Sequence, residues 1–402
     1  MKLTNVLLKQ HNGWLAKLKW KFQGRRNVYD TGAVTSLQNR GIAVIDAIDY
    51  VKKNNRNFVP QVQENVSENN QFPSSYIFSD SNVLVYGTMQ AQVLTKSIML
   101  NELPENIERK FEMLKLPTDI ERSMHQSVLV SHLLDAEQKK SPIRVPLRPD
   151  KPKHIIRKEY SITDIRKNSL MATRLINHCE RFFGHTESLK KRVINDVRFM
   201  VPIVKNGDDI QYNLKAETFI ATKKPIEPFK ISGNSNISVP DISPLSQSIS
   251  IPFEVNVERK CSYPIKLGSP FSHPHTVLLH YSNLDVKNLF EEPVTNDQLE
   301  SRAIIKGFTV AASRAKTIYG DNVKTLQEPI TVQVVQLDGK RVQFGIFQLN
   351  TLDLDDTNGP TNYWFRKPEM LLYDECIYKE GRPLLTNYNF DVFKLMSIFY
   401  SN

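Results

Sequence analysis

The sequence predicts an α+β (mixed α/β) fold, a compact body of helices and mainly antiparallel strands that carries extended basic arms. Apolar and polar residues alternate from Ile210 to Ile220, which is the pattern of a half-buried strand. Asp338-Gly339 separates two apolar runs, and this dipeptide favours the tight turn of a hairpin. Between residues 296 and 319 apolar residues recur at helical spacing instead. Strands and helices therefore both contribute to the predicted core.

The chain has 402 residues, 40% of them hydrophobic, which is enough for two or three units with buried cores. Shifts in composition divide it into five predicted segments. They are 1–29, a mitochondrial transit peptide; 30–138, an N-terminal arm and helical region with an Asn/Gln-rich stretch at 54–71; 139–158, a basic, proline-rich extended strip; 159–258, a middle α+β unit with a long loop; and 259–402, a C-terminal α+β unit.

Hydrophobic spacing predicts the elements before the basic strip. A strand is expected at Tyr76–Phe78 and a helical stretch from Val83 to about Leu103. Pro104 then suits the first turn of a second helix, Glu105–Leu114, because the first turn of a helix does not use the N–H that proline lacks.

The middle unit begins at Ser161–Asp164, which fits a capping box and predicts the start of a helix. A second helix is expected at Leu189–Val197. Strands are expected at Val201–Val204 and Ile210–Ile220. Residues 225–252 are rich in Ser, Pro and Asn, so they are predicted to form a long loop.

The last unit has the clearest local signals. Thr295 or Asn296 is expected to cap a helix that runs to Tyr319, and Gly320 to supply a left-handed C-cap at positive φ. Two strands, Ile330–Leu337 and Arg341–Leu349, are expected to pair through the Asp338-Gly339 turn. A closing helix is predicted at about Asp391–Tyr400, with Phe393, Met396 and Tyr400 on one face.

Positive charge is concentrated in two parts of the chain. Residues 1–29 carry seven Lys and Arg residues and no acid, and residues 139–158 carry eight and a single acid, Asp150. These two parts hold 15 of the 53 basic and one of the 43 acidic residues, which leaves 38 basic and 42 acidic residues elsewhere. The charge therefore indicates a targeting segment and an anion-binding arm on a body that is not itself basic.

Residues 1–29 have the composition of a mitochondrial transit peptide. Apolar residues such as Leu7, Trp14 and Phe22 are interleaved with lysines, as in an amphipathic helix, and no continuous apolar segment of a secretory signal occurs. A basic ribosomal or RNA-binding tail that is never removed is the alternative interpretation. No apolar run approaches 18 residues, so no membrane span is predicted.

The strip at 139–158 is the main candidate for binding. Its four prolines, at 142, 146, 149 and 152, oppose helix and favour an extended backbone. Cations spaced along such a backbone can follow the phosphates of RNA, and each contact releases a counterion. A solvated linker between two domains is the alternative. The predicted RNA-binding residues are Lys139, Lys140, Arg144, Arg148, Lys151, Lys153, Arg157 and Lys158.

The sequence carries little sign of enzyme chemistry. No phosphate-binding loop, dinucleotide-binding, zinc-protease or nucleophile-elbow motif occurs in the sequence. The three cysteines lie far apart, which argues against a disulfide framework or a zinc ribbon. His273-Pro274-His275, with His280, offers metal ligands, but no Cys or carboxylate lies nearby at ligand spacing, so a structural turn is preferred. We therefore expect no catalytic residues, no metal and no cofactor.

The best carboxylate cluster is Asp353, Asp355 and Asp356. If these residues continue a strand, Asp353 and Asp355 point the same way and can hold Mg²⁺. The preferred interpretation is a polar loop in which the Asp side chains cap turn amides. The metal-binding interpretation supports one rival function, a matrix enzyme acting on RNA.

Several short blocks occur in a fixed order between residues 76 and 380. They are Tyr76-Ile77-Phe78, Leu94-Thr95-Lys96, Leu103-Pro104-Glu105, Pro274-His275-Thr276, Leu278-Leu279, Ile318-Tyr319-Gly320, Gln327-Glu328-Pro329, Val332-Gln333, Asp338-Gly339, Phe347-Gln348-Leu349-Asn350-Thr351, Leu352-Asp353-Leu354-Asp355 and Leu371-Leu372-Tyr373. In this order they resemble the family of mitochondrial large-subunit ribosomal protein thirty-seven, above all from Pro264 to Tyr373. The arm before Tyr76 departs from the family, because it is rich in Asn where the vertebrate arm is richer in Pro and aromatic residues.

The resemblance implies a structural, non-enzymatic component of the large ribosomal subunit in the mitochondrial matrix, with a role in mitochondrial translation. It implies contact with mitochondrial large-subunit rRNA and with other large-subunit proteins. Among these partners it implies a paralogue once counted as small-subunit protein thirty. The family offers no catalytic residues to transfer to this chain.

Overall fold

The computed structural model describes residues 32–45, 75–133, 143–148, 151–157, 163–229, 238–254, 257–282, 286, 288, 292–357, 359–379 and 382–402. The chain divides into two units, residues 1–71 and 72–402. In the first unit the described segment contains a short helix, α2 (Ala33–Asn39). The predicted transit peptide at 1–29 and the Asn/Gln-rich stretch at 54–71 lie outside the described residues.

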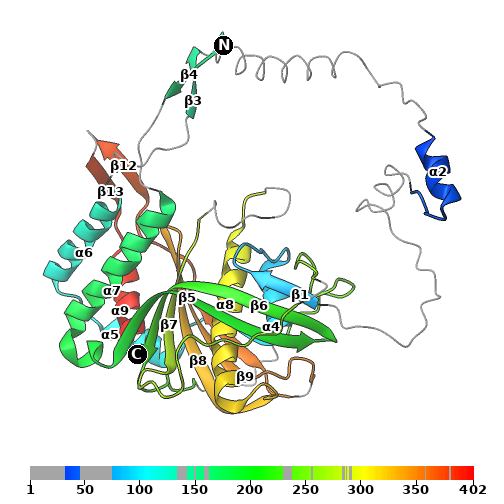
Figure 1. The fold of residues 1–402 in the computed structure, drawn as a ribbon. Helices are drawn as coiled ribbons and strands as arrows, with labels where there is room; N and C mark the ends of the chain where they lie inside the picture. Colours follow the sequence, from blue (N-terminus) through cyan, green and yellow to red (C-terminus); the bar gives the residue numbers. More distant parts are fainter. Residues whose placement is uncertain are drawn as a thin grey trace. The chain divides into compact units, whose positions relative to one another are not determined.

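A nine-stranded sheet organises the second unit (Figure 1). Its strands are β1 (Ser75–Ser79), β2 (Ser97–Leu100), β5 (Lys191–Lys205), β6 (Asp208–Thr222), β7 (His273–His280), β8 (Thr325–Leu337), β9 (Arg341–Thr351), β10 (Asn362–Arg366) and β11 (Met370–Leu371). The order is β1-β6-β7-β8-β9-β10-β2, with β5 paired to β6 and β11 paired to β9. The pairs β1–β6, β7–β8 and β10–β2 are parallel, and the others are antiparallel.

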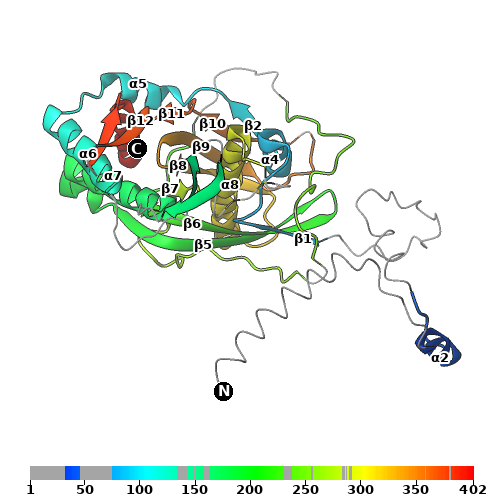
Figure 2. The ribbon, with the colours of Figure 1, turned by 90° about the horizontal axis from the view of Figure 1, so that it is seen from above.

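Helices cover both faces of this sheet (Figure 2). They are α4 (Gly87–Thr95), α5 (Glu105–Met113), α6 (Thr118–Ser131), α7 (Asp164–Ser188), α8 (Asn296–Tyr319) and α9 (Asp391–Ser401). On one face, with α4 and α8, Phe308 packs against Phe347 of β9 at 5.9 Å between ring centroids. On the other, with α5, α6, α7 and α9, Phe399 packs against Phe344 of β9 at 5.2 Å. The sheet is therefore the middle layer of three.

Neighbouring residues of a strand supply these two separate cores. Val334 of β8 belongs to the core under α8, and Val335 belongs to the core on the opposite face. Side chains alternate across a strand, so a strand covered on both faces is apolar at consecutive positions. The predicted α+β class is confirmed, and so is the predominance of antiparallel pairing.

The predicted helix and hairpin of the last unit are confirmed. The Oγ1 of Thr295 accepts a hydrogen bond from the N–H of Gln298, whose Oε1 accepts one from the N–H of Thr295, so α8 begins with a capping box. Asp338 Oδ1 accepts hydrogen bonds from two amides in the β8–β9 turn, those of Lys340 and Arg341, at 2.9 and 2.6 Å. The closing helix is α9, and its predicted apolar face is buried.

Gly320 ends α8 at positive φ, as predicted, but not in the left-handed helical conformation. Its φ is 89° and its ψ is 169°. This is an extended conformation of the mirror-image region that essentially only glycine adopts. The sign of φ in the prediction is therefore correct, and the predicted left-handed cap is wrong.

Two predicted helices are wrong in part or completely. The stretch from Val83 to Leu103 is helical in α4 only, because Lys96 with φ of 47° ends the helix and β2 follows. The helix predicted at Leu189–Val197 is instead the first part of β5, which pairs with β6 along its length. The partner of β2, strand β10, is distant in the sequence, whereas the partner of β5 is the next strand, β6. In both cases strand pairing overrides local helical spacing.

The long loop predicted at 225–252 lies between β6 and β7, and its described residues contain no helix or strand. The two strands on either side of this loop are neighbours, with Thr218 opposite Leu278. The predicted middle and C-terminal units therefore contribute to one sheet. A separate two-stranded sheet, β12 (Glu375–Lys379) with β13 (Arg382–Thr386), precedes α9.

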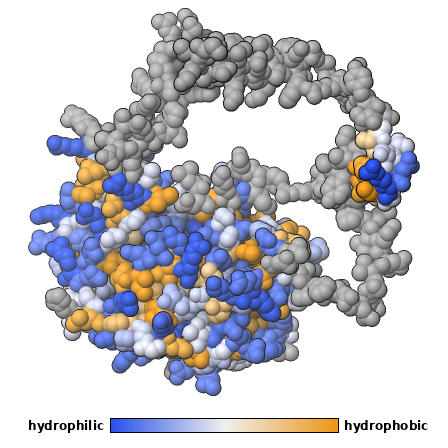
Figure 3. Space-filling model, viewed as in Figure 1, coloured by the Kyte–Doolittle hydropathy of each residue, from blue (hydrophilic) through white to orange (hydrophobic). Residues whose placement is uncertain are grey.

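The face of the described body that Figure 3 draws is largely polar. Figure 3 shows hydrophilic residues over most of one face, interrupted by smaller patches of hydrophobic residues. Within the described part of the chain, no helix combines the length and the apolar character that crossing a membrane requires.

Candidate nucleic-acid interface

Five of the eight predicted RNA-binding residues lie in a second small sheet, formed by β3 (Ile143–Arg148) and β4 (Lys151–Arg157). They are Arg144, Arg148, Lys151, Lys153 and Arg157, whereas Lys139, Lys140 and Lys158 lie outside the described residues. The backbone is extended in both strands, as the proline spacing predicts. The two halves of the strip pair as an antiparallel hairpin, with Arg148 opposite Lys151, so the expectation of a single extended strip is corrected.

A two-stranded sheet explains how this backbone tolerates its prolines. Pro146 lies in β3 opposite His154, and Pro152 lies in β4. Each strand of a two-stranded sheet has one edge without a strand partner, where the N–H that proline lacks is not needed for pairing. In this register Arg148 is the one cation that faces another, Lys151, whereas Arg144 and Arg157 are opposite isoleucines.

A hollow between α6 and α7 contains arginines that the sequence analysis did not single out. Its cavity volume is about 400 Å³, and Arg122 of α6 and Arg174 of α7 both line it, with Asp119, Ser123, Gln126, Ser127 and Val130. Within the described residues neither arginine forms an ion pair with a carboxylate. Both guanidinium groups are therefore available for an external anion.

The potential around this hollow is positive. His178 of α7 lies within hydrogen-bonding distance of Ser127, 2.8 Å from its Nε2 to the hydroxyl oxygen. Burial lowers the pKa of His178, and the charges of Arg181 and Arg174 lower it further. Arg174 and Arg181 are seven residues apart, two helical turns, and this spacing was a signal in the sequence for a basic helix face.

Other cations near the end of α7 are already paired. Glu187 accepts hydrogen bonds from Lys190 at 2.6 Å and from Lys191 at 3.4 Å. At the start of α7, Lys167 contacts Asp164 at 2.9 Å. These lysines are less available to an external anion than Arg122 and Arg174, because an incoming phosphate has to displace a carboxylate.

Two aspartates of the predicted carboxylate cluster are each close to a lysine. Asp353 contacts Lys324 at 3.0 Å, and the hydrogen bond from this lysine lowers the pKa of Asp353. Asp355 accepts a hydrogen bond from the N–H of Asn206 at 2.9 Å and lies 3.6 Å from the ammonium of Lys205. Within the described residues no three His, Cys, Asp or Glu side chains are placed to hold a metal ion. The preferred interpretation, a loop with Asp side chains on turn amides, agrees with these contacts.

The histidine group belongs to a strand, so the predicted structural turn is wrong. His273, His275 and His280 all lie in β7, which is paired with β6 on one edge and with β8 on the other. His275 is buried, with Nδ1 2.8 Å from Thr276 Oγ1 and Nε2 3.1 Å from the backbone carbonyl of Asn402. Burial lowers the pKa of His275 to about 3, so its imidazole is neutral at physiological pH.

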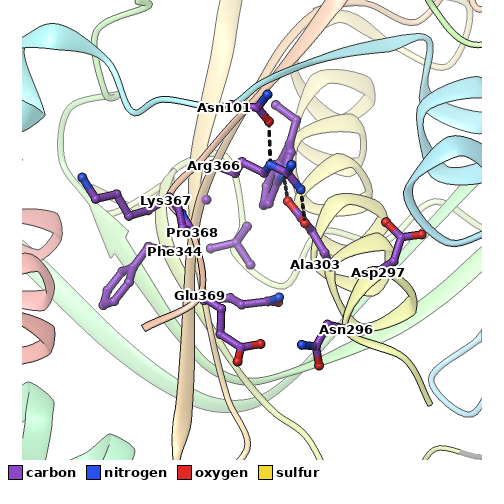
Figure 4. Close-up of a pocket in the computed structure, with 14 residues that line it drawn as sticks. Asn101, Asn296, Asp297, Ala303, Phe344, Arg366, Lys367, Pro368 and Glu369 are labelled. Carbon is purple, nitrogen blue, oxygen red and sulfur yellow. Dashed lines mark hydrogen bonds and ion pairs between the residues drawn. The ribbon is translucent and has the colours of Figure 1, made fainter. Parts of the chain in front are cut away.

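A cavity of about 440 Å³ lies between the start of α8 and strands β9 and β10 (Figure 4). Glu300 accepts hydrogen bonds there from Trp364 Nε1 at 2.9 Å and from Arg366 at 2.7 Å. Arg366 also donates through Nε to Asn101 at 2.8 Å. These polar groups satisfy one another, so the arrangement ties α8 to the sheet edge and presents no nucleophile paired with a base.

Taken together, these observations define a three-layer α+β protein with a hairpin rich in basic residues and a cationic hollow between two helices. No family model matches the chain. Proteins named large ribosomal subunit protein mL37 do match it. The rat protein (Rattus norvegicus) is 24% identical over 309 residues and the cow protein (Bos taurus) 26% over 313, each covering 74% of this chain. The chicken protein (Gallus gallus) is 34% identical over 146 residues, 36% of this chain and 33% of its own length.

The chain is a relative of the mL37 proteins, so the resemblance found in the sequence blocks is confirmed. The matched region spans 66% of the length of the rat and cow proteins.

Proposed function

We propose that this protein is a structural component of the large subunit of the mitochondrial ribosome, located in the matrix and without catalytic activity. The observation that carries the proposal is the similarity to the mL37 proteins over 74% of the chain. The contacts of the aspartate cluster agree with this proposal. The rival function, a metal-dependent enzyme that acts on RNA, needs a metal site, and the described residues contain no group of three metal ligands.

In this proposal the β3–β4 segment binds large-subunit rRNA. Residues 139–158 hold eight cations against one acid, and the extended backbone of β3 and β4 spaces five of them for successive phosphates. Each phosphate contact releases counterions, which favours binding and makes it depend on salt concentration. Such contacts hold a protein on RNA without reading the base sequence.

The hollow between α6 and α7 is a second phosphate contact in this proposal. Two guanidinium groups from different helices can both donate hydrogen bonds to one phosphate, because each guanidinium presents its N–H donors in a planar fork. Ser123 and Gln126 line the same hollow and add neutral donors. Asp119 is the one acidic lining residue, so the hollow has a net positive charge.

The body is proposed to pack on neighbouring ribosomal proteins, among them the paralogue of the same family. Outside residues 1–29 and 139–158 the chain holds 38 basic and 42 acidic residues, so it is not a general RNA-binding surface. The β12–β13 hairpin presents apolar surface suited to a protein contact. Ile377 and Leu384 are directly opposite each other on it, and they are 50% and 49% exposed.

Ultraviolet cross-linking in intact mitochondria tests the RNA part of the proposal. The tagged protein is isolated under denaturing conditions and the attached RNA is sequenced. We expect large-subunit rRNA, with cross-linked peptides from residues 139–158 and from α6 or α7. Recovery of messenger or transfer RNA, or of no RNA, would contradict the proposal.

A further inference from the structure

A groove of about 600 Å³ opens where β2 ends and α5 begins. Three segments line it: residues 100–106 with Arg109, the loop residues 227–229, and Phe365 of β10. It is separate from the β3–β4 hairpin, the α6–α7 hollow and the cavity beside Glu300, except that Asn101 lines both the groove and that cavity.

The floor of the groove is apolar and fixed in place. Leu103, Phe229 and Phe365 are 4%, 9% and 5% exposed, and they belong to the core on the α9 side of the sheet. The rings of Phe229 and Phe365 meet edge to face at 5.8 Å. The N–H of Phe229 donates to Gln348 Oε1 at 2.8 Å, which ties the loop to the sheet. The groove is therefore an opening onto a packed core and is preformed.

The rim of the groove is acidic. Glu102, Glu105 and Glu227 line it with one cation, Arg109. All three glutamates are exposed, and in the described chain none of them has an ion pair or a side-chain hydrogen bond. By contrast Glu108, on the same helix as Glu105, pairs with Lys367 at 2.8 Å. The rim therefore holds three free carboxylates around an apolar floor.

The backbone beside the groove also lacks a partner. β2 is the last strand in the sheet order, so its outer edge is not paired with a strand in the described chain. The chain runs from Leu100 of β2 directly along the groove, and the main-chain groups of residues 101–103 make no backbone hydrogen bond with other described residues. An extended segment that lies along them finds both donors and acceptors.

We propose that this groove binds an extended segment of a neighbouring protein in which apolar and basic residues are interspersed. An apolar side chain of that segment lies on Phe229 and Phe365, and flanking lysines or arginines contact Glu102, Glu105 and Glu227. Charge complementarity selects this occupant, because the same carboxylates repel the phosphates of RNA. The groove thus distinguishes a protein partner from the nucleic acid that the basic surfaces attract.

Peptide binding to the isolated full-length protein tests the proposal, independently of any ribosome. The probe is a short fluorescent peptide in which lysine and leucine alternate. One comparison peptide replaces leucine by serine and another replaces lysine by glutamate. The variant Glu102→Gln/Glu105→Gln/Glu227→Gln removes the rim charge. The variant Glu112→Gln/Glu258→Gln/Glu292→Gln makes the same charge change at exposed acids that do not line the groove.

We expect the rim variant to bind the lysine–leucine peptide about tenfold more weakly than wild type, since three exposed charge pairs are lost. The control variant should bind it like wild type, and both comparison peptides should bind poorly. Equal binding to the two variants would overturn the proposal. So would equal binding of the serine peptide, which would reflect charge alone, or no binding of any peptide.

A photo-cross-linker in place of Asn106, an exposed lining residue, identifies the occupant in the assembled particle. The proposal requires an adduct with a protein segment that carries Lys or Arg on both sides of an apolar residue. An adduct with RNA or with an acidic segment would overturn it, and so would the absence of any adduct in purified large subunits.

Discussion

The indole of Trp364 in β10 lies against the backbone of Gly345 in β9. A Cβ atom at position 345 would overlap the indole carbons Cζ2 and Cη2. The indole cannot easily move away, because its Nε1 donates to the buried carboxylate of Glu300 at 2.9 Å. Glycine is required here for close approach of a side chain, not for an unusual backbone conformation.

Substituting Gly345 by Ala should therefore destabilise the protein. The added methyl must displace Trp364 or separate β9 from β10, and overpacking of this kind costs about 1–3 kcal/mol. Urea unfolding measures the effect. Gly268→Ala is the matched control, because a Cβ at 268 meets nothing within 4 Å, and it should change stability by about 0.5 kcal/mol or less. Equal stability of the two variants would contradict this packing.

The backbone at Gly320 gives a second prediction, which separates backbone strain from crowding. A Cβ at 320 would meet nothing within 4 Å, yet φ is 89° and ψ is 169°. Gly320→Val should cost about 1–3 kcal/mol through backbone strain alone. Gly268→Val, at a glycine without positive φ, is the control in the same unfolding assay. A loss smaller than that of the control would show that α8 does not end in this conformation.

The lowered pKa of His275 predicts how the stability of the protein depends on pH. Its pKa is about 3 in the folded protein and near 6.5 in the unfolded chain. The unfolded chain binds more protons between these values, so the contribution of His275 is complete above pH 6.5 and is lost as pH falls toward 3. At pH 5 the loss should be about 2 kcal/mol relative to pH 7.

His275→Gln should make the difference in unfolding free energy between pH 7 and pH 5 smaller than in the wild type. The comparison is His125→Gln in α6, at a partly exposed position beside Tyr388. If His275→Gln and His125→Gln keep the same pH dependence as the wild type, the neutral, buried state of His275 is not what links stability to pH.

Salt dependence gives a prediction for the basic hairpin. If half of the eight cations at 139–158 contact phosphates, binding of the full-length protein to a short RNA duplex should have a log–log salt slope of about −3 to −4. Replacing Arg144, Arg148, Lys151 and Lys153 by Ser should flatten that slope and leave folding unchanged. The control replaces four exposed cations elsewhere, at 115, 192, 198 and 224, by Ser.

The double variant Arg122→Gln/Arg174→Gln extends this experiment to the α6–α7 hollow. It should reduce the magnitude of the slope by about 1 to 2, because each lost phosphate contact removes close to one unit. An unchanged slope in the hairpin variant would support the alternative that residues 139–158 are a solvated linker. An unchanged slope in the double variant would exclude the hollow alone.

Local sequence signals predicted the elements whose determinants are close together in the chain. The capping residues Thr295 and Gln298, and the Asp338-Gly339 turn, act over a few residues, so α8 and the β8–β9 hairpin could be predicted almost completely. The conformation of Gly320 could be predicted only in the sign of φ. Its ψ depends on how the chain leaves α8, which the sequence does not indicate.

Elements in which strand pairing overrides helical spacing could not be predicted in this way. Residues 189–197 have spacing that suits a helix, but from Lys191 on the chain pairs with the next strand, β6. The same reason applies to β2, whose partner β10 lies far along the chain. At the basic strip, proline and charge indicated an extended cationic backbone but not its pairing into a hairpin. Arg122 and Arg174 come together only because α6 packs on α7.

We propose above all that this relative of mL37 is a structural protein of the mitochondrial large ribosomal subunit. Sedimentation of the tagged protein in a mitochondrial lysate tests it most directly, with the Arg144/Arg148/Lys151/Lys153→Ser variant alongside. We predict that the wild-type protein sediments with large subunits and with complete ribosomes in moderate salt, and that the variant does so at lower occupancy. Wild-type protein at the top of the gradient, or with small subunits only, would contradict the claim.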